Sequence, residues 1–248
     1  MRRSDQPDAK AKIPNGTVAY AIGDIHGRVD LLEELQAKIQ EDARTQAGKR
    51  HVVVYLGDYV DRGLTSREVI DRLIEDPLPG FESVHLKGNH EDAMLKFLHD
   101  TDIAPGWLAY GGDATLYSYG VTVPRSPLTP DKLSTMQAEF ARKLPGRHLE
   151  FLSALDLRHE EGDYFFVHAG VRPGRSLEEQ SEEDLLWIRD AFLFSADDFG
   201  KIIVHGHTIS PKPEFQPNRI GIDTGAFASG VLTCLVLDGT EQRILQTG

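Results

Sequence analysis

Short apolar runs that stop at polar, glycine-containing clusters are the main pattern along the chain. Each run is a few residues long and rich in β-branched and aromatic residues, which is typical of a buried strand. Between the first three runs, apolar residues recur at helical spacing after Asp30 and after Ser66. Strands that alternate with helices predict an α/β sheet with parallel pairs. The runs that end in polar clusters span residues 17–22, 51–56, 83–86, 164–167 and 202–204.

The polar clusters stand where α/β sheets bind their ligands. In such sheets a ligand lies outside the carboxyl ends of the strands. Each cluster alone has an ordinary explanation, such as a Gly-Asp turn or an asparagine that caps a helix. Their joint occurrence at strand ends indicates one shared site. The side chains at these positions that can bind a metal are Asp24, His26, Asp58, Asn89, His168 and His207.

The later apolar runs lie closer together and predict a second sheet. A hairpin is expected within residues 155–167, where Glu160-Glu161-Gly162 separates two runs. Further strands are expected at residues 219–222, 231–237 and 243–245. We expect a partly antiparallel sheet that packs on the first one.

The two remaining segments lack this pattern. In residues 92–150, helix-like pieces alternate with prolines and glycines, which predicts an insertion over one rim of the site. Residues 1–16 are expected to form a flexible tail. Residues 17–248 then form a single domain, which carries the insertion.

The charge of the chain limits its partners. With 27 Lys and Arg against 39 Asp and Glu, the formal net charge is −12. No basic surplus is present to displace counterions, so nucleic acid is not an expected partner. The same charge would repel phosphate anions. Bound divalent cations would reverse the local sign at a site, so a phosphate-binding function favours metals.

Membrane and redox chemistry are also disfavoured. No apolar stretch approaches the roughly 20 residues that span a bilayer, so no membrane partner is expected. The single cysteine, Cys234, lies in the apolar run 231–237 and is expected to be a small buried core residue. We therefore expect a cytoplasmic protein. The sequence does not indicate an oligomeric state.

The donor set favours a centre with two metal ions. Carboxylate, imidazole and amide ligands suit manganese, iron or zinc better than a soft thiolate site would. Six protein ligands are too many for one catalytic ion, but they fit two ions that share a bridging carboxylate. Such ions lie roughly 3.5–4 Å apart and bind the attacking and leaving oxygens of an in-line displacement. Phosphate monoester hydrolysis is among the slowest uncatalysed reactions and needs this charge stabilisation.

The polar clusters form five motifs: Gly23-Asp24-Ile25-His26-Gly27, Gly57-Asp58-Tyr59-Val60-Asp61-Arg62-Gly63, Gly88-Asn89-His90-Glu91, His168-Ala169-Gly170 and Gly206-His207-Thr208. Together they resemble the phosphoprotein phosphatase branch of the calcineurin-like metallophosphoesterases. The last two motifs and the short chain are most similar to the bacterial and phage serine/threonine phosphatases. The resemblance extends from about residue 17 to 237. It implies an α/β sandwich of two mixed β-sheets flanked by helices, and two divalent ions, Mn²⁺ foremost and Fe or Zn as alternatives.

The resemblance also implies a division of the ligands between the two ions. Asp58 would bridge both ions, and Asn89 would contact the substrate phosphate as well as its metal. The expected ligands of the first ion are Asp24, His26 and Asp58, and those of the second are Asp58, Asn89, His168 and His207.

The remaining site residues are expected to act on the substrate. His90 resembles the general acid that protonates the leaving oxygen, and Asp61 its orienting partner, because a carboxylate fixes the tautomer and raises the pKa of an imidazole. Arg62 would bind a phosphate oxygen. Arg189 is the candidate for a second phosphate-binding arginine, and an ion pair with Asp190 is the alternative.

The expected reaction is the dephosphorylation of phosphoserine or phosphothreonine in proteins, with phosphotyrosine as an alternative, by attack of a metal-bridging hydroxide. No serine or cysteine stands beside a histidine in an elbow-like turn, which disfavours covalent catalysis. Symmetrical diadenosine tetraphosphate hydrolases are the alternative, but they typically lack the aspartate that Asp61 supplies here. A non-catalytic scaffold is disfavoured because no ligand or acid position is missing.

Overall fold

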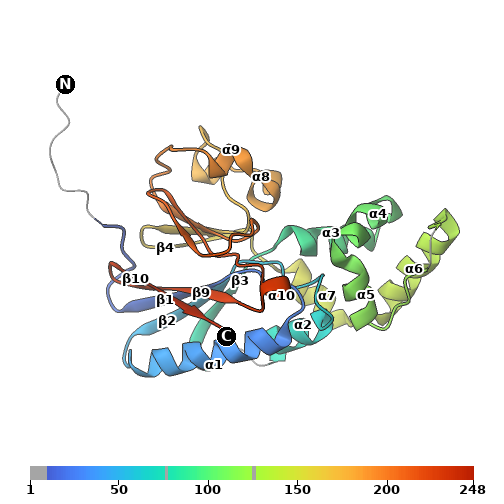
Figure 1. Ribbon diagram of the computed structural model, residues 1–248, viewed down its shortest axis with the longest axis horizontal. Coiled ribbons are helices and arrows are strands. Elements are labelled where there is room, and N and C mark those ends of the chain that lie inside the picture. Colours follow the sequence, from blue (N-terminus) through green and yellow to red (C-terminus); the bar gives the residue numbers. More distant parts are fainter. Residues whose placement is uncertain (1–9, 76–77, 125–126) are drawn as a thin grey trace.

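Two five-stranded mixed sheets pack face to face in the computed structural model, which describes residues 10–75, 78–124 and 127–248 (Figure 1). The first sheet has the order β10-β9-β1-β2-β3, with β1, β2 and β3 parallel and β9 antiparallel to both β1 and β10. Its strands are β1 (Thr17–Ile22), β2 (Arg50–Tyr55), β3 (Phe81–His85), β9 (Thr233–Asp238) and β10 (Glu241–Gln246).

The second sheet has the order β4-β5-β6-β8-β7. Strands β5, β6 and β8 are parallel, whereas β4 and β7 are antiparallel edge strands. Its strands are β4 (Arg158–Glu161), β5 (Tyr164–Val167), β6 (Ile202–His205), β7 (Glu214–Phe215) and β8 (Arg219–Gly221).

Strand β1 shows why its sequence is apolar at every position. All six of its residues are buried. Alternate side chains of a strand point to opposite faces. Tyr20 therefore packs in the core beneath the helices, while Ala19 and Ala21 pack in the core between the sheets, which also contains Phe166 of β5. A strand covered on both faces needs no polar face.

Helices cover the outer faces of both sheets and complete the layered sandwich in Figure 1. On the first sheet lie α1 (Val29–Arg44) and α2 (Ser66–Glu75), whose buried residues include Leu35 and Ile70. On the second sheet lie α8 (Glu182–Trp187) and α9 (Asp190–Leu193). Ser181 caps α8 by accepting a hydrogen bond from the Asp184 N–H. Two short helices, η3 (Leu177–Glu179) and α10 (Ala226–Ser229), lie in loops.

A group of helices extends to one side of the sandwich (Figure 1), in the region of the expected insertion. It packs around an aromatic cluster in which the ring centroids of Phe97 and Trp107 are 5.0 Å apart and those of Trp107 and Phe140 are 6.0 Å apart. We call this group the rim helices. They are α3 (Asn89–Phe97), η1 (Thr101–Ile103), α4 (Ala104–Trp107), η2 (Leu108–Gly112), α5 (Asp113–Ser118), α6 (Pro130–Lys143) and α7 (Gly146–Ser153).

The fold class and the positions of the principal strands are confirmed, but the assignment of strands to sheets needs correction. The runs 231–237 and 243–245 do not extend the second sheet; β9 and β10 return to the first, beside β1. Strands β5 and β6 supply parallel pairs to the second sheet instead. An apolar run indicates that a strand is buried, but it does not indicate which strand lies beside it.

The tail expected at residues 1–16 includes a residue that is anchored in the fold. Residues 1–9 lie outside the described residues. Ile13 is fully buried between the sheets, and its N–H donates to the carbonyl of Gly239. The apolar side chain of Ile13 therefore anchors the chain ahead of β1. Cys234 is buried in β9, as expected. Among the described residues, no helix combines the length and the apolar character that a membrane crossing needs.

Candidate metal centre

The loops that follow the strands bring the predicted ligands together from both sheets. Two groups of side chains place potential ligand atoms within 4.8 Å of one another, and Asp58 belongs to both. Every member of the two groups is buried. The first group is His26, Asp58 and His90, and the second is Asp58, His168 and His207.

Asp58 occupies the position of a bridge between the two groups. Its Oδ2 lies 3.5 Å from Nε2 of His26, and its Oδ1 lies 3.4 Å from Nε2 of His168. Burial disfavours the ionised form, but the surrounding histidines, His168 first, hold the pKa of Asp58 well below its usual range. The two carboxylate oxygens are therefore ionised and directed to opposite sides.

Backbone carbonyls fix the tautomers of two of these histidines. His26 donates from Nδ1 to the carbonyl of Val60 at 2.8 Å, and His168 donates from Nδ1 to the carbonyl of Leu56 at 2.9 Å. Each Nε2 then presents a lone pair toward Asp58. Burial lowers the pKa of His26 to about 3 and also lowers the pKa of His168. Neutral imidazoles oriented by such hydrogen bonds are the form that binds metals.

Asn89 and His207 complete the second group. Oδ1 of Asn89 lies 2.9 Å from Nε2 of His168, and Nδ1 of His207 lies 3.2 Å from the same atom. Burial lowers the pKa of His207 to about 2. Its buried Nε2 has no hydrogen-bond partner among the described residues. The donor set fits a divalent cation, because it combines neutral imidazoles, an amide oxygen and an ionised carboxylate.

Asp24 lies beside these groups rather than within them. Its carboxylate accepts hydrogen bonds from the backbone N–H of His207 at 3.1 and 3.2 Å. Burial, together with the nearby carboxylates of Asp223 and Asp58, raises the pKa of Asp24 well above its usual value. Three buried acids in one region need positive charge nearby, and divalent cations would supply it.

Backbone strain is concentrated at the predicted site. In the described part of the chain, every non-glycine residue with positive φ is one of its residues. Such conformations are unfavourable for residues with a Cβ atom and are typical of functional sites. These residues are His26 (φ 47°), Asp58 (54°), Asp61 (73°), Arg62 (68°) and His207 (63°).

Two glycines in the motifs permit close packing at the ligands. A Cβ atom on Gly88 would lie 2.1 Å from Oδ1 of Asp58, and one on Gly206 would lie 2.0 Å from Oδ1 of Asp24. A side chain at either position would displace a carboxylate. This explains why glycine precedes Asn89 and His207.

The proposed acid and its partner form a short hydrogen bond. Nδ1 of His90 lies 2.6 Å from Oδ2 of Asp61, and its Nε2 lies 3.3 Å from a guanidinium nitrogen of Arg62. Burial opposes protonation of His90, but the carboxylates of Asp58 and Asp61 outweigh it and raise its pKa to about 9. The Arg62 guanidinium also lies over the ring of Phe227, 4.6 Å from its centroid.

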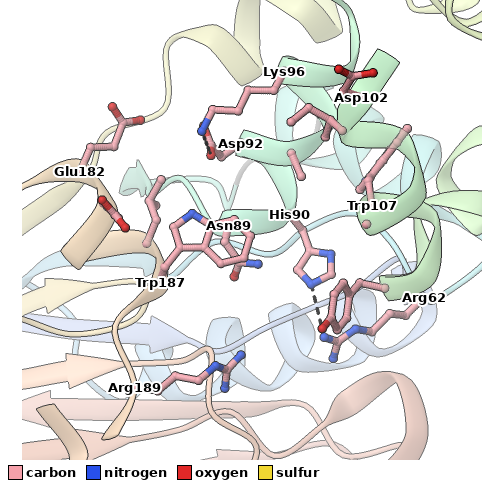
Figure 2. Close-up of a pocket in the computed structure, with 16 residues that line it drawn as sticks. Arg62, Asn89, His90, Asp92, Lys96, Asp102, Trp107, Glu182, Trp187 and Arg189 are labelled. Carbon is pink, nitrogen blue, oxygen red and sulfur yellow. Dashed lines mark hydrogen bonds and ion pairs between the residues drawn. The ribbon is translucent and has the colours of Figure 1, made fainter. Parts of the chain in front are cut away.

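A pocket of about 850 Å³ opens from this site between the rim helices and α8. Figure 2 shows Arg62, Asn89, His90 and Arg189 in its wall, with the guanidinium of Arg189 below Asn89. Arg189 lies 3.4 Å from both the carbonyl of His207 and the hydroxyl of Thr208. An ion pair between Arg189 and Asp190 is not found among the described residues.

Two acids at the site were missed by the sequence analysis. Glu91 is fully buried, and it accepts backbone N–H groups from the loop after β2, those of Asp58 and Tyr59 at 2.8 Å. Its position three residues after Gly88 has capping-box spacing, which was the available signal. Asp223 is 3% exposed and hydrogen-bonds Asp24, and burial raises its pKa to about 6. It follows β8, so the strand-end rule could have identified it.

The chain is similar to phosphatases and to dinucleotide tetraphosphatases. The chain is 27% identical over 227 residues to serine/threonine-protein phosphatase 2 of Salmonella typhimurium strain LT2, covering 86% of this chain and 90% of the relative. It is 25% identical over 229 residues to the asymmetrical bis(5′-nucleosyl)-tetraphosphatase PrpE of Anoxybacillus flavithermus strain WK1, covering 86% and 88%. A crystal structure provisionally assigned as a diadenosine tetraphosphatase has the same fold, with a TM-score of 0.61, 21% identity, and coverage of 98% of this chain and 96% of that one.

A family model that matches most of the chain identifies the family. The family model for calcineurin-like phosphoesterases matches residues 18–227, which contain all the predicted ligands. The family expected from the five motifs is thereby confirmed. Because the match covers most of its length, the chain belongs to the calcineurin-like phosphoesterases and is a phosphoester-hydrolysing enzyme.

Proposed function

We propose that this enzyme removes phosphate from phosphoserine and phosphothreonine side chains of proteins. The observation that carries the proposal is the His90–Asp61 pair beside Arg62, at the inner end of an open pocket. A general acid is needed because serine and threonine alkoxides are poor leaving groups. An open pocket can admit a protein segment.

The proposed metal centre uses the ligands that the loops bring together. Two divalent ions, Mn²⁺ foremost, would neutralise charge on the phosphoryl group and lower the pKa of a water so that it can attack. Asp24 is assigned to the first ion on the resemblance of its motif, although it lies outside the closely spaced groups and its carboxylate accepts the backbone N–H of His207. The proposed ligands are Asp24, His26 and Asp58 for one ion, and Asp58, Asn89, His168 and His207 for the other.

The chain's own residues then act on the phosphate and the leaving group. Arg62 and Arg189, together with the Asn89 amide, are proposed to bind the phosphate oxygens. His90 donates a proton from Nε2 to the leaving oxygen, while Asp61 holds its Nδ1. A cytoplasmic location stays a prediction from composition.

A dinucleotide polyphosphate is the second candidate substrate, because several relatives carry the name bis(5′-nucleosyl)-tetraphosphatase. Those relatives are named asymmetrical, whereas the alternative expected from the sequence is a symmetrical hydrolase. The two cleavages differ in products: symmetrical cleavage of diadenosine tetraphosphate yields only ADP, and asymmetrical cleavage yields ATP and AMP.

The deciding experiment compares substrates on one preparation with Mn²⁺. Phosphoserine, phosphothreonine and phosphotyrosine peptides are assayed beside diadenosine tetraphosphate, and nucleotide products are separated by chromatography. We expect kcat/KM for a phosphoserine or phosphothreonine peptide to exceed that for the dinucleotide by at least about tenfold, a difference of about 1.4 kcal/mol. A preference for the dinucleotide would contradict the proposal. Absence of chelator-sensitive p-nitrophenyl phosphate turnover would instead support a non-catalytic scaffold.

A further inference from the structure

We propose that Trp107 and Thr115, on the rim helices, are positioning residues that hold the Asp61 carboxylate and thereby orient His90. The proposal assigns a role in catalysis to α4 and α5, which contribute no residue to the two ligand groups above. It rests on the proposed function of His90 as the general acid.

The Asp61 carboxylate is fully buried and held at both oxygens. Its Oδ2 accepts from Nε1 of Trp107 at 2.8 Å as well as from His90 at 2.6 Å. Its Oδ1 accepts from the Thr115 hydroxyl at 2.6 Å. A buried carboxylate depends on such donors, because it has lost its hydration. The two donors from the rim helices therefore fix the plane of the carboxylate against which His90 is aligned.

Thr115 also holds the backbone of Asp61. Its Oγ1 accepts the backbone N–H of Asp61 at 2.8 Å while its proton goes to Oδ1 of the same residue. Asp61 has a φ of 73°, so its backbone needs external support. One threonine thus fixes both the main chain and the side chain of the orienting acid.

The next residue, Arg62, is held by the same segment. Its backbone N–H donates to the carbonyl of Gly111 at 3.0 Å. Gly111 has a φ of 103°, and a Cβ atom there would lie 2.7 Å from the Arg62 nitrogen. A Cβ atom on Gly112 would lie 2.5 Å from the Trp107 ring. The two glycines permit the segment to lie directly against Asp61 and Arg62.

A purely structural role for Trp107 is the competing explanation, because its ring also packs in the aromatic cluster with Phe97 and Phe140. Conservative variants separate the two roles. Trp107→Phe keeps an aromatic ring but removes the N–H donor. Thr115→Val keeps the shape but removes the hydroxyl, and Thr115→Ser restores it.

Tyr119→Phe is the matched control. Tyr119 is 3% exposed and packs on Phe140, as Trp107 does. Its hydroxyl hydrogen-bonds Nδ1 of His148 at 2.8 Å, away from Asp61. The control therefore removes one buried hydrogen bond from the same rim helices and leaves the His90–Asp61 pair intact.

The kinetic test compares a phosphoserine peptide with p-nitrophenyl phosphate, whose leaving group needs little protonation. We expect Trp107→Phe and Thr115→Val to lower kcat on the peptide about tenfold, with KM unchanged and little loss on p-nitrophenyl phosphate. Thr115→Ser should recover most of the activity, and Tyr119→Phe should retain it. In a His90→Asn background, Trp107→Phe should cause no further loss. Equal losses on both substrates, or a further loss in that background, would overturn the proposal.

A spectroscopic test decides the same question without turnover. The proton in the short His90–Asp61 hydrogen bond should give a downfield nuclear magnetic resonance signal in protein prepared with diamagnetic Zn²⁺, and His90→Asn should abolish it. We expect Trp107→Phe to shift or broaden this signal and Tyr119→Phe to leave it in place. An unchanged signal in Trp107→Phe contradicts the positioning role. A protein that lacks monoesterase activity but shows the expected shifts would refute the proposed function and retain the positioning.

Discussion

The strand-end loops and the rim helices approach the site from different directions and in different ways. Loops within a few positions of a strand end contribute four of the five residues in the two closely spaced ligand groups, and the fifth, His90, lies in the first turn of α3. The rim helices beyond α3 contribute contacts to Asp61 and Arg62, from positions 46 to 54 residues away from Asp61. Strand ends thus place most of the ligands, whereas the rim helices beyond α3 hold the side chain of Asp61 and the backbone of Arg62.

This difference explains why the ligands at strand ends can be recognised from sequence motifs, whereas the contacts that hold Asp61 cannot. A ligand next to a strand end is positioned by the sheet, which is the same wherever the fold occurs. The Asp61 carboxylate depends on side chains that must pack against it from another element. Predictions that perturb one region and spare the other can test this separation.

The largest effect is expected in the strand-end loops, at Asp58. Asp58→Asn removes a charge from the residue common to both ligand groups. We expect metal content to fall and kcat to fall at least about 10³-fold, because bound ions contribute several kcal/mol to the transition state. Elemental analysis and p-nitrophenyl phosphate turnover measure both. Asp113→Asn, an exposed acid of the rim helices, should retain metal and activity. Full metal content and turnover in Asp58→Asn would disprove the assignment.

The next effect is expected where the two regions meet, at His90. His90→Asn should lower kcat on a phosphoserine peptide by about 10²-fold or more, because a general acid typically contributes that much to proton transfer. The loss on p-nitrophenyl phosphate should be far smaller, since p-nitrophenolate leaves without a proton. Steady-state kinetics on both substrates supply the ratio. If both substrates lose the same factor, His90 does not act as the acid.

A smaller effect, on stability, is expected at Glu91, which ties α3 to the loop after β2. Its two carboxylate oxygens accept four backbone N–H groups. In Glu91→Gln the amide nitrogen faces two of these donors, which should destabilise the fold by about 2–6 kcal/mol at 1–3 kcal/mol for each unpaired buried group. Urea unfolding measures the change. Glu241→Gln, an exposed acid of β10, should change stability by less than about 0.5 kcal/mol. Equal stability of the two variants would show that the hydrogen bonds of Glu91 do not stabilise the fold.

The smallest effect is expected in the rim helices, at Gly111. Gly111→Ala places a Cβ atom at a φ of 103° and against the backbone of Arg62. We expect a stability loss of about 1–2 kcal/mol from the left-handed conformation and a raised KM as Arg62 shifts. Thermal unfolding and steady-state kinetics measure the two effects. A Cβ atom on Gly146, in α7, would meet no atom within 4 Å, so Gly146→Ala should leave KM unchanged. An unchanged KM in Gly111→Ala would show that the contact does not position Arg62.

Most of the predicted site could be derived from sequence because its residues follow strand ends. Asp58 and His168 come from different sheets, yet both could be identified by the strands before them. The same rule would have identified Asp223, which follows β8. Asp24 was predicted as a ligand, and the structure places its carboxylate at the His207 backbone, because the loop after β6 approaches it closely.

The features that escaped prediction depend on contacts between distant elements. The order of strands is one, since β9 and β1 pair without any signal in either apolar run. The role of Trp107 is another, because a tryptophan among helical residues predicts burial in a core and its Nε1 contact with Asp61 is formed only in the packed structure. Local patterns give the elements, and tertiary packing gives their partners.

The pairing of β1 with β9 also has a consequence for how the chain folds. Val18 lies opposite Asp238, so the central strand of the first sheet acquires one of its two neighbours from a segment far away along the chain. During synthesis on the ribosome, that edge of β1 stays unpaired until β9 has emerged. Pairings between such distant segments slow folding, and an open apolar edge favours aggregation. We therefore expect refolding to be slow, and chaperones to improve its yield.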